Sequence, residues 1–147
     1  MITCDLQKKS LRLAILHKQC FDHFPQPYSA NTFYEFLQNK NYYLAEVKYK
    51  GFAIARVVSE VAELITIAVD PGFRGKGIGQ KVLNELIYKV LDTNANQFML
   101  EVASNNQAAI NLYIKLGFTA IHKRKNYFRH KNVAIDAIVF KRLLQMV

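Results

Sequence analysis

The sequence predicts an α/β fold with a mixed central sheet of about six to seven strands and flanking helices. An apolar, β-branched run ends at Val69, and a glycine-rich turn and an amphipathic helical pattern over Ile78–Leu91 follow it. A second apolar run, Phe98–Val102, comes after that helix, so the two runs form a parallel pair joined by a right-handed crossover. Shorter apolar runs before and after this unit predict antiparallel strands, which make the sheet mixed.

The N-terminal part of the chain predicts two helices. Apolar residues in 11–16 indicate a first helix that runs to about Cys20 and ends before the prolines of residues 24–27. Met1–Cys4 is expected to form a short edge strand. Ser29 is a candidate N-cap for a second helix whose phenylalanines share one face.

The remaining elements follow from turn signals between apolar runs. Tyr42–Val47 and Phe52–Val58 predict a hairpin, and Glu63–Val69 predicts the strand that enters the glycine turn. A helix is expected from about Asn106 to Leu116, ended by Gly117. Phe118 to Tyr127 and Val133–Phe140 then predict a last antiparallel pair.

Composition limits the classes of protein that fit. The chain has 147 residues and is 51% apolar, enough for one domain over residues 1–147. Apolar runs stay below the ~20 residues of a membrane span, and the first residues do not resemble a secretion signal, so we expect a cytoplasmic protein. Cys4 and Cys20 are expected as free thiols. The spacing of His17, Cys20 and His23 superficially resembles a metal site, but we expect a helix that buries the cysteine and exposes the histidines.

The charge is positive and unevenly distributed. Twenty basic residues against eleven acidic residues give a formal charge of +9, and the segment from Lys115 to Arg142 holds eight basic residues against Asp136 alone. Such a face suits a polyanionic cofactor or an RNA-rich neighbourhood such as a ribosome. A surface that only keeps the protein in solution is the alternative explanation.

The glycine-rich turn has the properties of a phosphate-binding loop. Gly75, Gly77 and Gly79 allow positive φ and leave no Cβ to hold a ligand away, so successive N–H groups can point at one anion. The turn opens a helix, whose first amides and dipole also favour negative charge. Arg74 and Lys76 add positive charge. The sequence of the turn matches neither of two better-known phosphate-binding motifs, G-x-x-x-x-G-K-[ST] and G-x-G-x-x-G.

The turn, spelled R-G-x-G-x-G over Arg74–Gly79, resembles the pyrophosphate-binding signature of the GNAT superfamily of acetyl-CoA-dependent N-acetyltransferases. Glu101–Tyr113 with Leu116–Phe118 looks like the E-V-x-x-x-N-x-x-A-x-x-L-Y-x-x-x-G-F pattern of its RimI-type branch, the ribosomal-protein-alanine N-acetyltransferases. Arg124–Phe128 and Asp136–Ala137 resemble the R-R-N-Y-Y and D-A elements of that branch. The resemblance covers the C-terminal two thirds with specific motifs and implies the GNAT fold, splayed at the cofactor site.

The resemblance also implies roles for individual residues. Glu101 would accept the proton of the acceptor amine, through water, and Tyr113 would give a proton to the coenzyme A sulfur. Asn106 would contact the pantetheine arm. The remaining cofactor residues implied are the strand amides of Ile67, Ala68 and Val69 and the pyrophosphate turn formed by Arg74, Gly75, Lys76, Gly77, Ile78, Gly79 and Gln80. Without the motif, Glu101 would be a solvated charge and Tyr113 a core residue.

Departures from the branch pattern concern the acceptor. Tyr28-Ser29 stands where the branch often has Trp-Ser, Ala103 stands at a position that is often basic, and Phe128 replaces the second tyrosine. Arg129–Val133 replaces a loop that usually contains glycine and acid. The coenzyme prediction does not depend on these positions, whereas the identity of the acceptor does.

The function that we expect is acetyl transfer from acetyl-CoA, without a metal, to the N-terminal α-amine of a ribosomal protein, with alanine as the first residue. Another protein N-terminus, a lysine side chain or a small amine is the alternative acceptor. A basic RNA-binding module is the non-enzymatic alternative, although the sequence lacks the aromatic and basic signatures of common RNA-binding folds. Oligomeric state does not follow from the sequence.

Overall fold

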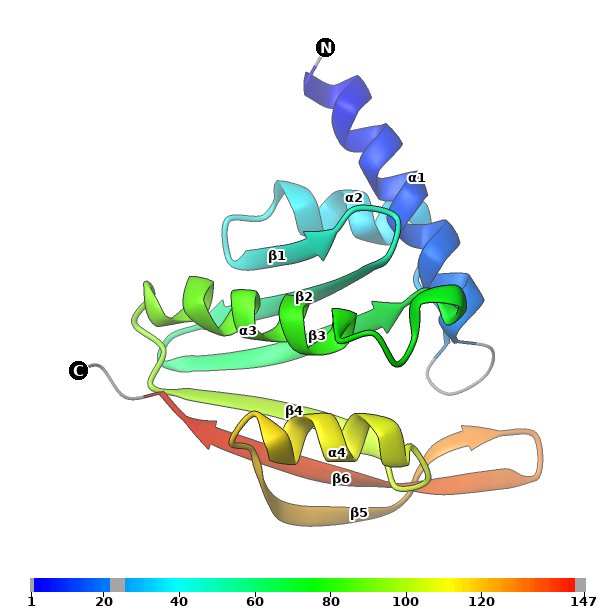
Figure 1. Cartoon of the computed structure of the whole chain (residues 1–147), viewed down its shortest axis with the longest axis vertical. Helices are drawn as coiled ribbons and strands as arrows, with labels where there is room; N and C mark the ends of the chain where they lie inside the picture. Colours follow the sequence, from blue (N-terminus) through cyan, green and yellow to red (C-terminus); the bar gives the residue numbers. More distant parts are fainter. Residues whose placement is uncertain (1, 22–25, 145–147) are drawn as a thin grey trace.

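The computed structural model describes residues 2–21 and 26–144 and contains one six-stranded sheet in the order β1-β2-β3-β4-β6-β5 (Figure 1). Only the β3–β4 pair is parallel, so the predicted mixed sheet is confirmed. The strands are β1 (Tyr42–Val47), β2 (Gly51–Val58), β3 (Val61–Val69), β4 (Gln97–Ala103), β5 (Thr119–His130) and β6 (Val133–Leu143).

Helices cover both faces of the sheet. The helices are α1 (Ile2–Cys20), α2 (Ala30–Gln38), α3 (Ile78–Leu91) and α4 (Gln107–Lys115), with a 3₁₀ turn, η1, at Pro71–Phe73. Figure 1 shows α3 and α4 on the near face and α1 and α2 behind β1 to β3. None of the helices in the described ranges is long and apolar enough to cross a membrane.

Two hydrophobic cores follow from this arrangement. The core under α3 and α4 includes Phe98, Leu100 and Val102, which alternate along β4. The core under α1 and α2 includes Phe33 and Phe52. Because side chains alternate between the faces of a strand, Met99, Glu101 and Ala103 project from β4 on the face opposite α4.

The parallel strands β3 and β4 diverge along most of their length. They pair through three residues each, from Val61↔Gln97 to Glu63↔Met99. The remaining residues of β3 and β4 do not pair with each other. In β3 the register with β2 shifts between Thr66 and Leu64, which leaves Ile65 as an extra residue. Such a bulge bends a strand and increases its twist, which explains why β3 turns away from β4.

The N-terminus differs from the sequence prediction. The predicted edge strand over Met1–Cys4 is wrong, because α1 is already helical at Ile2 and Met1 lies outside the described residues. Ile2 and the residues after it form the first turn of α1, and the sheet has six strands in the part of the chain that the structure describes. Ser29 caps α2 as predicted, and its Oγ accepts a hydrogen bond from the N–H of Thr32.

The predicted helix over Ile78–Leu91 has the bounds expected from its pattern, and the predicted helix near Asn106–Leu116 is α4 with those two residues as its caps. Gly117 follows with φ of 91°, a conformation that glycine tolerates best. The last hairpin extends further than predicted, to His130 in β5 and Leu143 in β6.

Candidate active site

The glycine turn between β3 and α3 has the open backbone that the sequence predicts. Gly75 and Gly77 have φ of 75° and 82°, and a Cβ added at either would meet nothing within 4 Å. The Asp70 side chain accepts a hydrogen bond from the N–H of Gly72 and so shapes the start of the turn. The loop therefore presents backbone rather than side chains to a ligand.

Gly79 serves a different purpose from the other two glycines. It lies inside α3, and a Cβ there would come within 3.3 Å of the Leu112 side chain and 3.6 Å of Val69. The expectation of positive φ therefore holds for two of the three glycines. The third lets α3 begin close to β3 and α4, which keeps the turn tight.

The N-terminus of α3 supplies further donors. The amides of Ile78, Gly79 and Gln80 are in the first turn of α3 and have no acceptor within the helix, and the N-cap residue Gly77 has no side chain that could accept from them. Together with the helix dipole these amides favour an anion. A diphosphate suits such a turn, because Gly75 and Gly77 carry no side chain that would keep an anion from the backbone N–H groups.

The basic residues of the turn lie around this site. The Arg74 Nε donates to the Val69 carbonyl at 3.3 Å, which joins the turn to the end of β3. The Lys76 Nζ lies 5.5 Å from the centre of the Phe73 ring, and the Lys50 Nζ lies 5.2 Å from it. Lys50 was not among the predicted site residues; it becomes a neighbour because β2 begins beside the end of β3.

Ile67, Ala68 and Val69 lie on the part of β3 that has separated from β4. In a strand, every second residue turns its N–H and C=O groups toward the same side. The Asp70 N–H donates to the Lys50 carbonyl on the side of β2, so by this alternation Ala68 also turns its groups toward β2. Ile67 and Val69 turn their N–H and C=O groups toward the gap, so the predicted cofactor contact through the Ala68 amide does not fit this geometry. This edge can therefore hydrogen-bond an extended ligand that enters between the two strands.

Glu101 projects from β4 and is held by two residues of β5. Its Oε1 lies 3.2 Å from the Arg124 Nε, and it also accepts a hydrogen bond from the Tyr127 hydroxyl. The Glu101 side chain is 31% exposed, so a ligand can reach it. The hydrogen bond and the negative charge of Glu101 raise the pKa of Tyr127, which keeps its hydroxyl a donor.

A wide bulge in β5 positions Tyr127. Between Arg124 and Phe128 the register with β6 shifts, and Asn126 takes a φ of 53°. Its N–H donates to the Asp136 Oδ1 at 2.9 Å, and this bond holds the pKa of the Asp136 carboxyl below its usual range. The Arg124 guanidinium lies 5.4 Å from the centre of the Tyr127 ring. The bulge thus holds both partners of Glu101 in one cluster.

Tyr113 lies on α4 and is buried in the core on the other face of the sheet. Its ring centre is 6.0 Å from those of Phe118 and Phe140, and 3% of the residue is exposed. Burial raises the pKa of its hydroxyl above the ordinary value, so the group stays protonated at neutral pH. Glu101 and Tyr113 therefore belong to opposite faces of the sheet, and a ligand in the gap between β3 and β4 lies between those faces.

Asn106 has a structural role beside the predicted one. Its Oδ1 accepts a hydrogen bond from the N–H of Ala109 at 3.2 Å, which makes it the N-cap of α4. The cap uses the side-chain oxygen. The side-chain nitrogen is the atom that would donate to a ligand.

The expected arrangement of the His17, Cys20 and His23 segment is wrong. His17 is 0% exposed, whereas Cys20 is half-buried and its Sγ lies 3.1 Å from the Val69 carbonyl oxygen. His23 lies outside the described residues. Among the residues that are described, no group of three or more histidine, cysteine or acidic side chains is arranged to hold a metal.

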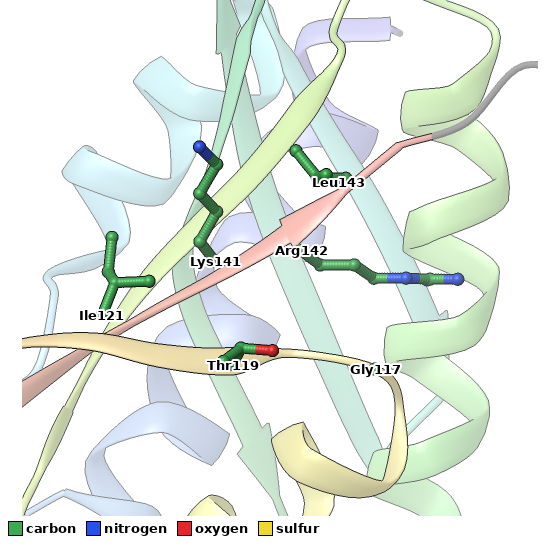
Figure 2. A pocket seen from close by; sticks show the side chains of 6 residues that line it. All are labelled: Gly117, Thr119, Ile121, Lys141, Arg142 and Leu143. Carbon is green, nitrogen blue, oxygen red and sulfur yellow. The ribbon is translucent and has the colours of Figure 1, made fainter.

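A shallow hollow of about 440 Å³ lies beside β5 and β6, away from the predicted site residues (Figure 2). Lys141 and Leu143 line it and follow Val139, the partner of Glu101 in the β4–β6 register, at alternate positions. The hollow therefore continues along the face of the sheet that carries Glu101. Figure 2 shows the Arg142 side chain extending in another direction from that of Lys141.

The fold and the turn together define a class of α/β protein. Proteins of this class can bind a phosphate-bearing ligand at the start of a helix, and the divergence of β3 from β4 leaves a strand edge beside that point. Open α/β sheets commonly bind ligands at such strand ends.

Comparison with known proteins gives the family. The chain belongs to the acetyltransferase (GNAT) family, whose model matches residues 11–118. It is 37% identical over 117 residues to a [ribosomal protein bS18]-alanine N-acetyltransferase of Salmonella typhimurium, covering 77% of this chain and 78% of that relative.

Solved structures show the same fold. The crystal structure of the ribosomal-protein-S18-alanine N-acetyltransferase from Escherichia coli matches with a TM-score of 0.82 at 30% identity, covering 95% of this chain and 90% of the other. NAA60 of Arabidopsis thaliana in complex with acetyl-CoA matches with a TM-score of 0.81 at 18% identity, covering 93% of this chain and 94% of the other. The GNAT fold predicted from the motifs is confirmed, and the enzyme class is that of an N-acetyltransferase.

Proposed function

We propose that this protein transfers the acetyl group of acetyl-CoA to the N-terminal α-amine of a ribosomal protein that begins with alanine. The relatives named above support the acceptor, because they acetylate alanine on bS18 or its equivalent according to their names. The observation that supports the proposal is that Glu101 projects from β4, which pairs with β3 through only three residues, on the face of the sheet opposite the core that contains Tyr113.

The glycine turn and the free edge of β3 fit acetyl-CoA. Its diphosphate would accept hydrogen bonds from the amides of Gly75 to Gln80, with Arg74 and Lys76 adding positive charge. Its pantetheine arm would lie along Ile67, Ala68 and Val69, with the Asn106 side-chain amide as a further donor. The thioester would then lie in the gap, between Glu101 and Tyr113.

The reaction needs a neutral amine, a polarised carbonyl and a proton for the leaving thiolate. The amine attacks the thioester carbonyl, and Glu101 accepts the proton that the nitrogen loses, through a water molecule. The C–S bond then breaks, and Tyr113 gives its proton to the sulfur and regains one from solvent. Burial raises the pKa of Tyr113, so its hydroxyl is present as the acid form that this step requires.

The chemistry of the amine favours an N-terminus over lysine. An α-amine with pKa ~8 is roughly one tenth neutral at pH 7, whereas a lysine amine with pKa ~10.4 is neutral in only a few parts in ten thousand. Because a larger share of an α-amine is already neutral at this pH, its acetylation depends less on a base than the acetylation of lysine does.

Mass spectrometry tests the proposal directly. The enzyme is incubated with labelled acetyl-CoA and two peptides of one sequence that begins with alanine and contains an internal lysine. The N-terminal amine is free in one peptide and blocked in the other. We expect label on the free α-amine and none on the lysine. Transfer confined to the blocked, lysine-containing peptide would contradict the proposal and favour the lysine alternative.

The same incubation with intact ribosomal proteins identifies the acceptor. We expect one labelled N-terminus among them. The basic surface of β5 supports action close to the ribosome, since Lys123, Arg124 and Lys125 are all exposed there. Cytoplasmic location stays a prediction, as does an acceptor on the assembled particle.

A further inference from the structure

We propose that His17 is a positioning residue, which ties the segment before α2 to the diverging part of β3 and so fixes the acceptor side of the site. This inference rests on the proposed function. His17 lies on α1 and contacts two elements that come later in the chain. Its role requires no contact with the reacting atoms.

The two ring nitrogens of His17 each have a partner on a different element. Nε2 lies 2.8 Å from the Thr66 Oγ1 of β3, and Nδ1 accepts a hydrogen bond of 3.2 Å from the backbone N–H of Tyr28. The ring is 0% exposed and packs against the rings of Phe21 and Tyr28, with centres 4.6 and 5.2 Å away.

These partners fix the protonation state of the ring. A backbone N–H can only donate, so Nδ1 must carry a lone pair and no proton. In a neutral imidazole the proton is then on Nε2, which donates to the Thr66 hydroxyl. A second proton on Nδ1 would face the N–H of Tyr28, so the neutral form with one defined tautomer is the form that holds both elements.

Both partners lie beside the proposed reaction. Thr66 follows the bulge at Ile65, where β3 leaves β4, and it precedes the strand edge proposed for the pantetheine arm. Tyr28 packs against the core under α1 and α2, which lies on the face of the sheet to which Glu101 projects.

A phenylalanine would fill the same aromatic space, since Phe33 and Phe52 also surround the ring at 5.4 and 6.2 Å. Histidine adds only the two hydrogen bonds, and these bonds join a loop segment to a strand rather than satisfying groups within one element. The contribution specific to histidine is therefore the spacing between Tyr28 and β3, which borders the space for the acceptor.

Two variants remove this connection without removing volume. His17→Phe loses both hydrogen bonds, and Thr66→Val loses one with little change in shape. We expect the KM for the alanine peptide to rise about threefold for Thr66→Val, which loses one hydrogen bond, and about tenfold for His17→Phe, which loses two. A threefold change corresponds to about 0.7 kcal/mol, which is within the usual net contribution of one hydrogen bond. The dissociation constant for acetyl-CoA should stay within twofold, and kcat should change less than KM.

Arg12→Gln provides the matched control on the same helix. Arg12 joins α1 to β1 through Glu46 at 2.6 Å and does not contact Tyr28 or Thr66 in the described structure. A general loosening of α1 would raise KM in this variant as well. We expect its KM to stay within twofold of that of the unmodified protein.

Hydrogen exchange at the Tyr28 amide measures the connection without any acceptor. We expect faster exchange at this amide in both variants and unchanged exchange in Arg12→Gln. If the unmodified protein transfers nothing to the alanine peptide, the proposed function fails while this exchange result still reports on the connection. Unchanged exchange of the Tyr28 amide in Thr66→Val would overturn the positioning role, and so would a KM within twofold of the unmodified protein in both variants. If His17→Phe does not fold, the result for Thr66→Val decides alone.

Discussion

The glycine turn and the Glu101 cluster are built in different ways. The turn is a local structure, in which positive φ at Gly75 and Gly77 and the first amides of α3 form the proposed cofactor-binding surface within a few residues. The cluster joins side chains of β4 and β5 that meet only after the sheet has formed. Binding of the cofactor should therefore depend on backbone conformation, and binding and reaction of the acceptor on side-chain contacts between distant parts of the chain.

The largest expected effect comes from a charge inside the turn. Gly77→Asp should weaken acetyl-CoA binding by about 100-fold or more, because a carboxylate would stand beside the diphosphate and the residue must keep a φ of 82°. Isothermal titration calorimetry measures this change. Gly77→Asn is the matched control, since it adds similar strain without charge and should lose far less affinity. Equal losses in the two variants would assign the effect to backbone strain.

The next effect concerns the reaction and not the cofactor. Glu101→Gln should lower kcat by about 100-fold, within the usual range for general-base catalysis, and leave acetyl-CoA affinity within about twofold. Steady-state kinetics together with calorimetry separates the two. An unchanged kcat across the pH range would exclude Glu101 as the proton acceptor, and a large loss of acetyl-CoA affinity would break the distinction between the two regions.

Tyr113 should show a smaller loss and a characteristic pH dependence. Tyr113→Phe keeps the packing on Phe118 and Phe140 and removes the acid, so kcat should fall about tenfold or more. Because burial raises the pKa of this hydroxyl, the acid form persists as pH rises, and the unmodified enzyme should show no alkaline loss of kcat from Tyr113 up to about pH 10. A fall in kcat near pH 8 that disappears in Tyr113→Phe would contradict this account.

The last prediction concerns the contribution of His17 to folding stability, which changes only when the pH falls below neutral. Burial lowers its pKa from 6.5 to about 4, so the unfolded chain binds a proton more readily than the folded one between these values. The stability contributed by neutral His17 is complete above about pH 6.5 and is lost as pH falls toward 4, amounting to about 3 kcal/mol.

Urea unfolding at pH 7 and pH 4.5 tests this linkage. The rings and the hydroxyl around His17 come from Phe21, Tyr28, Phe33, Phe52 and Thr66, and the Tyr28 hydroxyl, whose pKa burial raises, does not titrate in this range. The unmodified protein should lose more stability between the two pH values than His17→Phe. Equal losses would contradict this account, because they would show that the pKa of His17 is the same in the folded and unfolded states.

The same contrast explains what the sequence could predict. The glycine turn and the helix that follows it are local structures, and the crossover that contains them is nearly local. The spacing of the glycines and the helical periodicity therefore predict them. The family motifs pointed to Glu101, Tyr113 and Asn106, whose roles stay predictions. The divergence of β3 from β4 has a cause in the bulge at Ile65, which no local signal in an apolar run reveals.

The errors fall where distant contacts decide the structure. His17 was expected on the exposed side of α1, but Thr66 and Tyr28 satisfy both of its nitrogens and so permit its burial. Arg124 and Tyr127 lie in the segment that resembles the R-R-N-Y-Y element, to which the sequence assigns no role. The bulge at Asn126 brings both side chains to Glu101. The departures at Phe128 and Arg129–Val133 fall in this same hairpin, so we expect them to affect acceptor preference rather than cofactor binding.

A crystal structure of the protein with a conjugate of coenzyme A and an alanine-initiated peptide tests the central claim most directly. The account predicts the diphosphate oxygens within about 3 Å of amide nitrogens in Gly75–Gln80, and the sulfur between β3 and β4 with Tyr113 on one side and Glu101 on the other. A diphosphate bound away from the glycine turn, or a sulfur on the same side as both residues, would contradict it.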